Sequence, residues 1–184
     1  MIRNLVSKRV ILREIEEKDW VDVHKYASKE IVCQFQPWGP NTEKESKKFV
    51  NEAIDDAEKE PRTRFVFAII EKKKEIMIGS VEFNIRDITN RTGEIGYIVN
   101  PDFWGKGFAT EAANLILAFG FKHLNLHRIY ATCDPRNIAS SKVLEKICMT
   151  KEGRLREDLL MKEGWRDSLL YSILEHEWNE VVNN

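Results

Sequence analysis

Hydrophobic and polar residues follow two spacings along this chain, and together the spacings predict an alternating order of strands and helices. Apolar residues at every second position are typical of half-buried strands, whereas apolar residues three and four apart are typical of helices packed on a sheet. The longer spacing predicts helices over residues 20–28, 43–59, 109–122 and 138–147. The shorter spacing predicts strands over residues 10–15, 64–70, 76–85, 93–99, 127–133, 152–160 and 168–174.

Local signals mark several of these boundaries. Thr42-Glu43-Lys44-Glu45 has the form of a capping box, in which Thr42 and Glu45 satisfy each other's backbone N–H groups, and Pro61 follows the end of that helix. The strands over 64–70 and 76–85 are expected to form a hairpin with a bulge at Gly79, and the last two strands are expected to join around Gly164-Trp165. The order predicts an α/β (α+β) fold with a mixed sheet and helices on both faces.

Composition narrows the class of protein. The 184 residues suffice for one substantial core and contain no linker-like segment, so we expect a single domain over residues 1–184. Hydrophobic residues make up 42%, which excludes a disordered chain, and the formal net charge of −1 argues against a nucleic-acid partner. The dense basic run Lys72-Lys73-Lys74 is expected at a solvated hairpin tip. Because no apolar run is long enough to cross a membrane and the first residues lack a secretion signal, we expect a cytoplasmic protein without a membrane partner.

Cysteine and histidine residues give no sign of a disulfide framework or a metal site. The cysteines are odd in number and scattered, which predicts reduced thiols, and the histidines form no ligand cluster. The residues concerned are Cys33, Cys133 and Cys148, and His24, His123, His127 and His176.

A glycine-rich turn leads directly into the helix over residues 109–122 and predicts an anion cradle. The run Trp104-Gly105-Lys106-Gly107-Phe108-Ala109-Thr110-Glu111-Ala112 places two glycines before a helix N-terminus, where unpaired N–H groups and the positive end of the helix dipole favour a phosphate. A mononucleotide loop would need Lys-Ser or Lys-Thr after its last glycine, and a dinucleotide loop would need glycine in place of Thr110. We therefore expect a phosphate-bearing cofactor of another kind.

The strand over residues 93–99 followed by this turn and helix resembles the GNAT superfamily of acyl-CoA-dependent N-acetyltransferases. The superfamily loop Q/R-x-x-G-x-G/A aligns with Trp104-x-x-Gly107-x-Ala109, and the tryptophan is similar to the RimJ/RimL branch. The segments 7–13, 38–50, 134–146 and 152–178 resemble that branch as well, so the resemblance covers nearly the whole chain.

This resemblance implies a fold and a cofactor. The fold is a single GNAT domain with a mixed, mostly antiparallel seven-stranded sheet, in which the fourth and fifth strands splay apart at Asn100-Pro101 to admit acetyl-CoA or coenzyme A. The residues implied to bind the cofactor are Ile98, Val99, Trp104, Gly105, Lys106, Gly107, Phe108, Ala109, Thr110, Asn137 and Ser140.

The resemblance also suggests catalytic groups for direct attack of an amine on the thioester. Many members protonate the leaving thiolate with a tyrosine, but Leu144 occupies that position here, so Ser140 becomes the candidate proton donor, with capping of the helix as its alternative role. Glu94 is the candidate general base, acting directly or through water, and Glu82 is the second choice. A covalent route through Cys133 is disfavoured because no neighbouring residue would activate its thiol.

Three functions remain open for the chain. The first is acetylation of a protein or peptide N-terminal α-amine; the second is acetylation of a small amine such as a polyamine, an amino acid or an antibiotic; the third is an acyl-CoA-binding module with weak catalysis. The acceptor pocket is expected to include Phe35, Trp38 and Glu82, with Trp165 as a further wall. The resemblance to the family also suggests that the chain forms a homodimer.

Overall fold

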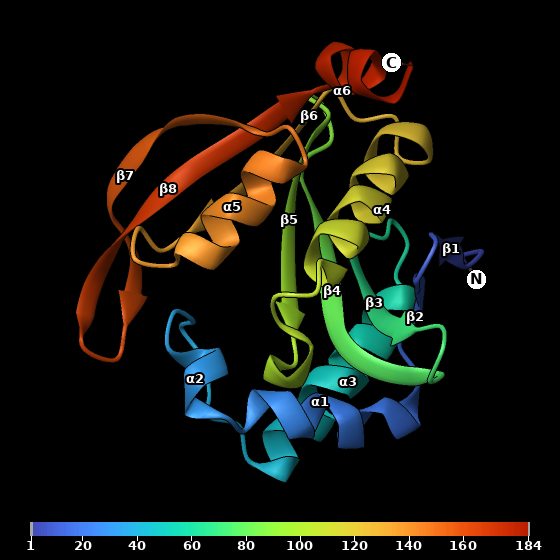
Figure 1. Cartoon of the computed structure of the whole chain (residues 1–184), viewed down its shortest axis with the longest axis vertical. Coiled ribbons are helices and arrows are strands. Elements are labelled where there is room, and N and C mark those ends of the chain that lie inside the picture. The colour runs from blue at the N-terminus through green and yellow to red at the C-terminus, as the bar shows by residue number, and fades with distance from the viewer. Residues whose placement is uncertain (1, 184) are drawn as a thin grey trace.

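The computed structural model describes residues 2–183, and its elements alternate in type along most of the chain. Their order is β1 (Leu5–Val6), β2 (Val10–Glu14), η1 (Glu17–Asp19), α1 (Trp20–Ala27), α2 (Glu30–Cys33), α3 (Glu43–Ala57), β3 (Arg64–Glu71), β4 (Ile76–Asp87), β5 (Thr92–Val99), η2 (Pro101–Phe103), α4 (Phe108–Lys122), β6 (Arg128–Cys133), α5 (Ile138–Lys146), β7 (Thr150–Met161), β8 (Gly164–Leu174) and α6 (Glu175–Asn183). Figure 1 shows the β7–β8 hairpin projecting from the rest of the sheet. Within residues 2–183 no helix is long and apolar enough to cross a membrane.

The strands form a mixed sheet in the order β1-β2-β3-β4-β5-β6-β8-β7. Every neighbouring pair is antiparallel except β5 and β6, which are parallel. The sheet has eight strands instead of the expected seven because β1, two residues long, pairs with β2 through Leu5↔Leu12 and Val6↔Ile11. Two residues are too few for a periodic pattern to be recognised in a sequence.

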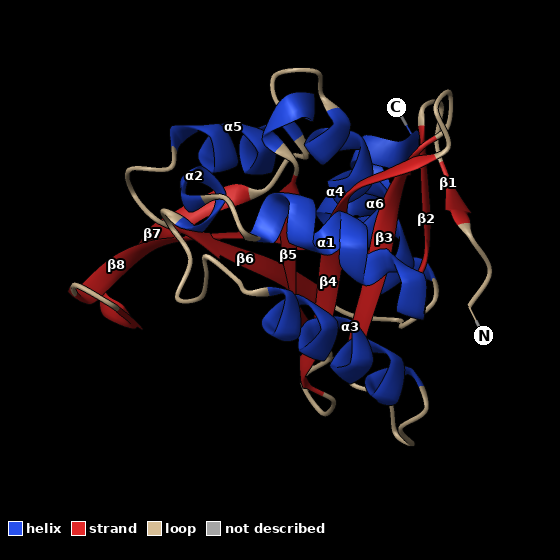
Figure 2. Cartoon of the chain, turned by 90° about the horizontal axis from the view of Figure 1, so that it is seen from below, coloured by secondary structure: helices blue, strands red, loops and turns tan. Residues whose placement is uncertain are grey.

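Two hydrophobic clusters cover the two faces of the sheet. Alternate residues of β3 face opposite ways: Phe65, Phe67 and Ile69 pack with α4, whereas Val66 and Ala68 pack with α1 and α3. Figure 2 shows α3 and α5 on opposite sides of the sheet. The helices on both faces confirm the expected layered architecture.

The parallel pair β5–β6 separates within the sheet, which confirms the expected splay but moves its starting point. The two strands pair only at Thr92↔Arg128, Gly93↔Ile129 and Glu94↔Tyr130. Beyond that point β5 continues along β4 to Val99, while β6 continues along β8 to Cys133. The strands therefore part directly after Glu94, earlier than the expected Asn100-Pro101, because each follows a different antiparallel partner.

The bulge expected at Gly79 lies one residue earlier. Ile69 pairs with Gly79 and Ile70 pairs with Met77, so Ile78 is the extra residue of β4. Gly79 has a different role, because a Cβ atom there would lie 2.1 Å from the Ile98 carbonyl oxygen. Only glycine allows β4 and β5 to approach this closely.

The C-terminal part differs from the expectation in two respects. The hairpin turns at residues 162–163, and Gly164 and Trp165 are the first residues of β8, paired with Met161 and Leu160. The segment that resembled the last strands as far as Trp178 ends in a helix, since α6 begins at Glu175. Trp178 stacks on Phe121 of α4 with ring centroids 5.2 Å apart, so the helix closes one end of the larger cluster.

Candidate active site

The glycine turn before α4 forms an open backbone cradle. Gly105 and Gly107 have φ angles of +72° and +81°, in the left-handed region that favours glycine, and Gly107 is the N-cap of α4. A Cβ atom at Gly105 would meet no heavy atom within 4 Å. The turn therefore leaves room for a ligand against the backbone at a helix N-terminus, which fits the pyrophosphate of coenzyme A.

The side chains of Trp104, Arg9 and Glu111 hold the cradle in place. The Trp104 indole Nε1 donates to the Val99 carbonyl oxygen at 2.6 Å, which ties the turn to the end of β5. Arg9 Nη1 donates to the Lys106 carbonyl oxygen at 2.9 Å, and Arg9 Nε pairs with Glu111 at 2.5 Å. Trp104 thus engages the backbone carbonyl group of Val99, one of the residues implied to bind the cofactor.

Glu111, for which the sequence suggested no role, stabilises this arrangement through hydrogen bonds to Ser7 and Arg9. Its carboxylate accepts from Ser7 Oγ at 2.8 Å and from the Arg9 backbone N–H at 3.2 Å, in addition to the Arg9 side chain. Burial opposes ionisation, but the hydrogen bonds from Ser7 and Arg9 lower the pKa of Glu111 below its ordinary value. The first turn of α4 is therefore fixed to the turn between β1 and β2 by a charged contact.

A cavity of about 650 Å³ opens between the splayed strands and the α1–α3 side of the sheet. It brings together the residues predicted for catalysis, Glu94 and Ser140, and for the acceptor pocket, Phe35, Trp38 and Glu82. Two of the residues predicted to bind the cofactor, Ile98 and Asn137, also line it. The cradle residues 104–110 and Val99 lie outside its lining. Trp165 also lies outside the lining, with 62% of its surface exposed on β8, so the expectation that it forms a wall of the pocket is wrong.

The loop that carries Phe35 and Trp38 is fixed to the β7–β8 hairpin. Arg166 Nη1 donates to the Phe35 carbonyl oxygen at 3.0 Å, and Lys162 Nζ donates to the Gly39 carbonyl oxygen. Cationic side chains of the hairpin therefore hold the backbone of the loop, which also contains the short helix α2 that periodicity did not reveal. These long-range contacts hold one wall of the cavity, to which Phe35, Trp38 and Arg166 contribute.

The start of α5 places Asn137 and Ser140 at the opening between β5 and β6. Asn137 caps the helix, since its Oδ1 accepts from the Ser140 backbone N–H at 3.0 Å. The Ser140 hydroxyl lies 3.0 Å from Tyr97 Oη of β5. Leu144, one turn further along α5, is 1% exposed and lines the cavity with an apolar side chain. Tyr97 was not among the predicted site residues, because its partner is 43 positions away in the sequence.

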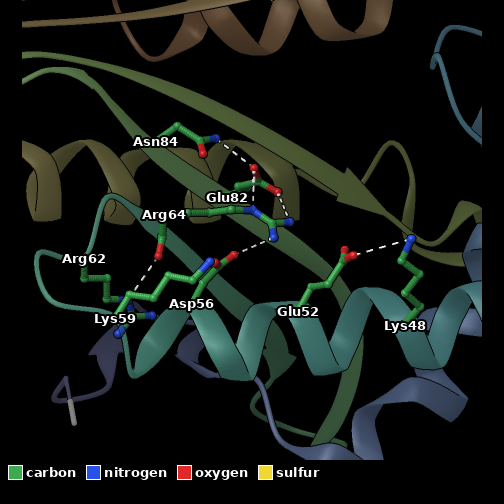
Figure 3. Close-up of polar contacts among 8 residues, drawn as sticks. All are labelled: Lys48, Glu52, Asp56, Lys59, Arg62, Arg64, Glu82 and Asn84. Atoms are coloured by element: carbon green, nitrogen blue, oxygen red, sulfur yellow. Dashed lines mark hydrogen bonds and ion pairs between the residues drawn. The ribbon is translucent and has the colours of Figure 1, made fainter.

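Both candidate bases are paired with arginine. Arg86 Nε and Nη2 contact one oxygen of Glu94, Oε2, at 2.7 and 2.6 Å. Arg64 engages both oxygens of Glu82 at 3.0 Å, and Asn84 donates to Glu82 Oε1 at 2.8 Å (Figure 3). Glu82 is thus held more completely than Glu94, which favours Glu94 as the carboxylate that can accept a proton.

Cys133 is placed as a structural group and not as a nucleophile. Cys133 is buried, and burial raises the pKa of its thiol above the ordinary value, with the Ser141 hydroxyl 3.5 Å away as its one hydrogen-bond neighbour among the described residues. A thiol in such surroundings is a weak nucleophile at neutral pH. Within residues 2–183 no group of three or more metal-ligating side chains gathers at one place.

Comparison with known proteins identifies the family. Residues 9–150 match the family described as acetyltransferase (GNAT) domain. The uncharacterized N-acetyltransferase YnaD of Bacillus subtilis is 41% identical over 177 residues, which span 96% of this chain and 99% of YnaD. Spermidine N(1)-acetyltransferase of Escherichia coli K12 is 30% identical over 100 residues, 54% of either chain.

Solved structures share the fold over nearly the whole chain. A GNAT-family acetyltransferase from Bacillus anthracis is 36% identical with a TM-score of 0.84, covering 95% of this chain and 100% of the other. Ribosomal-protein-S5-alanine acetyltransferase from Vibrio fischeri is 27% identical with a TM-score of 0.80, covering 96% and 99%. The chain therefore belongs to the GNAT family, with relatives that support a RimJ/RimL-like branch, and is an N-acetyltransferase that uses acetyl-CoA.

Proposed function

We propose that the protein acetylates the N-terminal α-amine of a peptide or protein by direct attack of the amine on acetyl-CoA. In this proposal the pyrophosphate lies against the backbone from Gly105 to Thr110, and the pantetheine arm runs through the opening beside Ile98 and Asn137. Acetyl-CoA supplies the activated acetyl group. Glu94, directly or through water, accepts the proton of the amine, and the Ser140 hydroxyl donates a proton to the departing thiolate.

The choice of acceptor rests on one observation, that the carboxylates lining the cavity already have partners. Each carboxylate in the lining already has a cationic or N–H partner, and the pairs are Glu45 with Thr42, Glu52 with Lys48, Glu82 with Arg64, Glu94 with Arg86 and Asp134 with Arg136. A polyamine carries several ammonium groups and needs unpaired carboxylates to replace its hydration. A monovalent acceptor makes no such demand.

The ionisation of amines also favours an α-amine as the acceptor. Its reference pKa is about 7.7 to 8.0 against about 10.4 for a lysine side chain, so at pH 7 its neutral fraction is more than 100-fold larger. An enzyme whose candidate bases are already paired with arginine gains most from an amine that is partly neutral in solution. The likeness to a ribosomal-protein-S5-alanine acetyltransferase over 96% of the chain supports the same acceptor class.

The runner-up is a small amine such as a polyamine, which the partial likeness to spermidine acetyltransferase favours. A comparison of kcat/KM separates the two. We expect a peptide with a free N-terminus to exceed both spermidine and the same peptide blocked at the N-terminus but carrying lysine, by about 100-fold near pH 7. Preferred turnover of spermidine would overturn the proposal and establish the small-amine function.

A variant tests whether charge pairing excludes polyamines. Arg64→Gln removes the partner of Glu82 and leaves that carboxylate with Asn84 alone, so the relative turnover of spermidine should rise several-fold. Lys59→Gln is the matched control, because Lys59 pairs with Asp56 on the far end of the same network, outside the cavity lining (Figure 3). An equal effect of the two variants would show that the pairing of Glu82 does not set acceptor choice.

A further inference from the structure

Tyr97 bridges the opening between the two splayed strands. It belongs to the segment of β5 that no longer pairs with β6, and its Oη lies 3.0 Å from Ser140 Oγ of α5. The same hydroxyl is placed to donate to the Ser140 carbonyl oxygen at 3.2 Å. Both residues line the cavity. The contact is thus made at the place where the cofactor arm is proposed to enter.

The two hydroxyl groups can share their protons in two ways. If Tyr97 donates to the Ser140 carbonyl oxygen, its oxygen is free to accept the Ser140 proton, which is then engaged with Tyr97. If Tyr97 donates to Ser140 Oγ, the Ser140 proton is free to reach another acceptor. In the second arrangement the Ser140 proton is available to a departing thiolate, and the donated hydrogen bond polarises the serine O–H.

The surroundings of Tyr97 keep its hydroxyl group protonated, so that it can donate a hydrogen bond. Burial raises the pKa of Tyr97 above its ordinary value, against the opposing effect of the hydrogen bond with Ser140, so the phenol stays protonated at neutral pH. The backbone of Ser140 is fixed by the Asn137 cap, which sets the distance between the two hydroxyl groups. At the next turn of α5 Leu144 offers no hydroxyl that could replace Ser140.

We propose that Tyr97 is a positioning residue for acetyl transfer: it donates to Ser140 Oγ and so turns the Ser140 proton toward the sulfur of coenzyme A. The inference rests on the proposed role of Ser140. Tyr97 itself gives up no proton in the overall reaction. The thiolate takes the Ser140 proton, and Ser140 recovers one from water, in balance with the proton that the acceptor amine loses.

A double-mutant cycle tests this coupling. Tyr97→Phe keeps the ring and removes one hydrogen bond, so kcat should fall about tenfold at saturating substrates, with little change in the affinity for coenzyme A. Ser140→Ala should lower kcat by about 100-fold or more. In the Ser140→Ala background, Tyr97→Phe should change kcat less than about twofold, since its partner is gone.

Tyr171→Phe is the matched control. It removes another phenol that contacts α5, with Tyr171 Oη 3.4 Å from Glu145, but Tyr171 does not line the cavity. Its kcat should stay near that of the wild type. If Tyr97→Phe and Ser140→Ala reduce kcat independently, or if Tyr171→Phe costs as much as Tyr97→Phe, the positioning role is wrong.

A binding measurement provides a readout that does not depend on turnover. At pH 9.5, above the reference pKa of about 8.5 for a cysteine thiol, part of the coenzyme A is in the thiolate form, and calorimetry compares its affinity with that of desulfo-coenzyme A. We expect the wild type to bind coenzyme A more tightly than desulfo-coenzyme A. In Tyr97→Phe the ratio of these two affinities should fall about tenfold. An unchanged preference in Tyr97→Phe would overturn the inference.

The outcomes separate this inference from the proposed function. Wild-type kcat in Ser140→Ala would reject Ser140 as the proton donor and the positioning role with it. Impaired Ser140→Ala together with wild-type kcat in Tyr97→Phe would reject the positioning role alone. Thermal unfolding of each variant verifies that the compared proteins are folded.

Discussion

Gly79 and Gly96 lie on the neighbouring strands β4 and β5, and the same substitution is expected to have opposite effects at the two positions. A Cβ atom at Gly79 would lie 2.1 Å from the Ile98 carbonyl oxygen and 2.9 Å from the Val99 Cα atom. A Cβ atom at Gly96 would meet nothing within 4 Å. The pair therefore isolates the effect of close strand approach from the general effect of replacing glycine.

The expected magnitude follows from these distances. The shortest contact at Gly79 falls 1.3 Å below the 3.4 Å of an ordinary contact, and its partners are backbone atoms that no rotamer change can move. Forced overpacking of this kind costs about 1–3 kcal/mol, and one kcal/mol shifts the Tm of a protein of this size by about 2–4 °C. Gly79→Ala should therefore lower the Tm by about 2 to 12 °C. Gly96→Ala should leave the Tm unchanged or slightly higher, because it restricts the unfolded chain by about 0.4–1 kcal/mol.

Scanning calorimetry of the two variants without ligand is the assay. Because the displaced backbone of Gly79→Ala belongs to Ile98 and Val99, we also expect weaker binding of coenzyme A to this variant. Equal melting temperatures for Gly79→Ala and Gly96→Ala would refute the reasoning.

Three further predictions concern the cradle, the end of α5 and the buried thiol. Gly107→Glu should abolish calorimetric binding of coenzyme A in a protein that still unfolds cooperatively, because a like charge would occupy the phosphate position; unchanged affinity would contradict the cradle. Cys148 has a φ of +63° after the last turn of α5, where Met149 N donates to the Leu144 carbonyl oxygen, so Cys148→Gly should be about 0.5–1 kcal/mol more stable to urea than Cys148→Ala. Equal stability of that pair would mean that the left-handed residue carries no strain. Cys133→Ala should retain turnover, because attack by the amine needs no covalent intermediate; lost turnover with intact cofactor binding would require an acyl-cysteine.

Periodicity predicted the longer elements of the fold because most of them present one apolar side to a sheet or a helix. The strand β7 is an exception, since most of its residues are exposed. The capping box at Thr42 is formed, with Glu45 N donating to Thr42 Oγ1 at 3.3 Å and Thr42 N donating to Glu45 at 2.8 Å. Some elements were not predicted, for two reasons. β1 and α2 span two and four residues, too few to show a period, and α6 follows β8 without a breaker, so the sequence gives no signal at Glu175.

The parts of the site that depend on local sequence could be predicted, and those that depend on packing could not. The glycines of the cradle have positive φ angles, which glycine adopts more easily than other residues, so their spacing before a helix was informative. The Arg64–Glu82 and Arg86–Glu94 pairs join different strands, and Tyr97 meets Ser140 only because β5 leaves β6 after Glu94. Such contacts follow from sheet register, which no single segment of the sequence specifies.

The site of acetylation on a peptide that carries both a free N-terminus and an internal lysine tests the proposed activity most directly. The protein is incubated with acetyl-CoA and this peptide near pH 7, and fragmentation mass spectrometry locates the added acetyl group. We expect the acetyl group on the N-terminal α-amine, with the lysine side chain unmodified. Acetylation of the lysine, or an unmodified peptide under conditions in which spermidine is acetylated, would contradict the account.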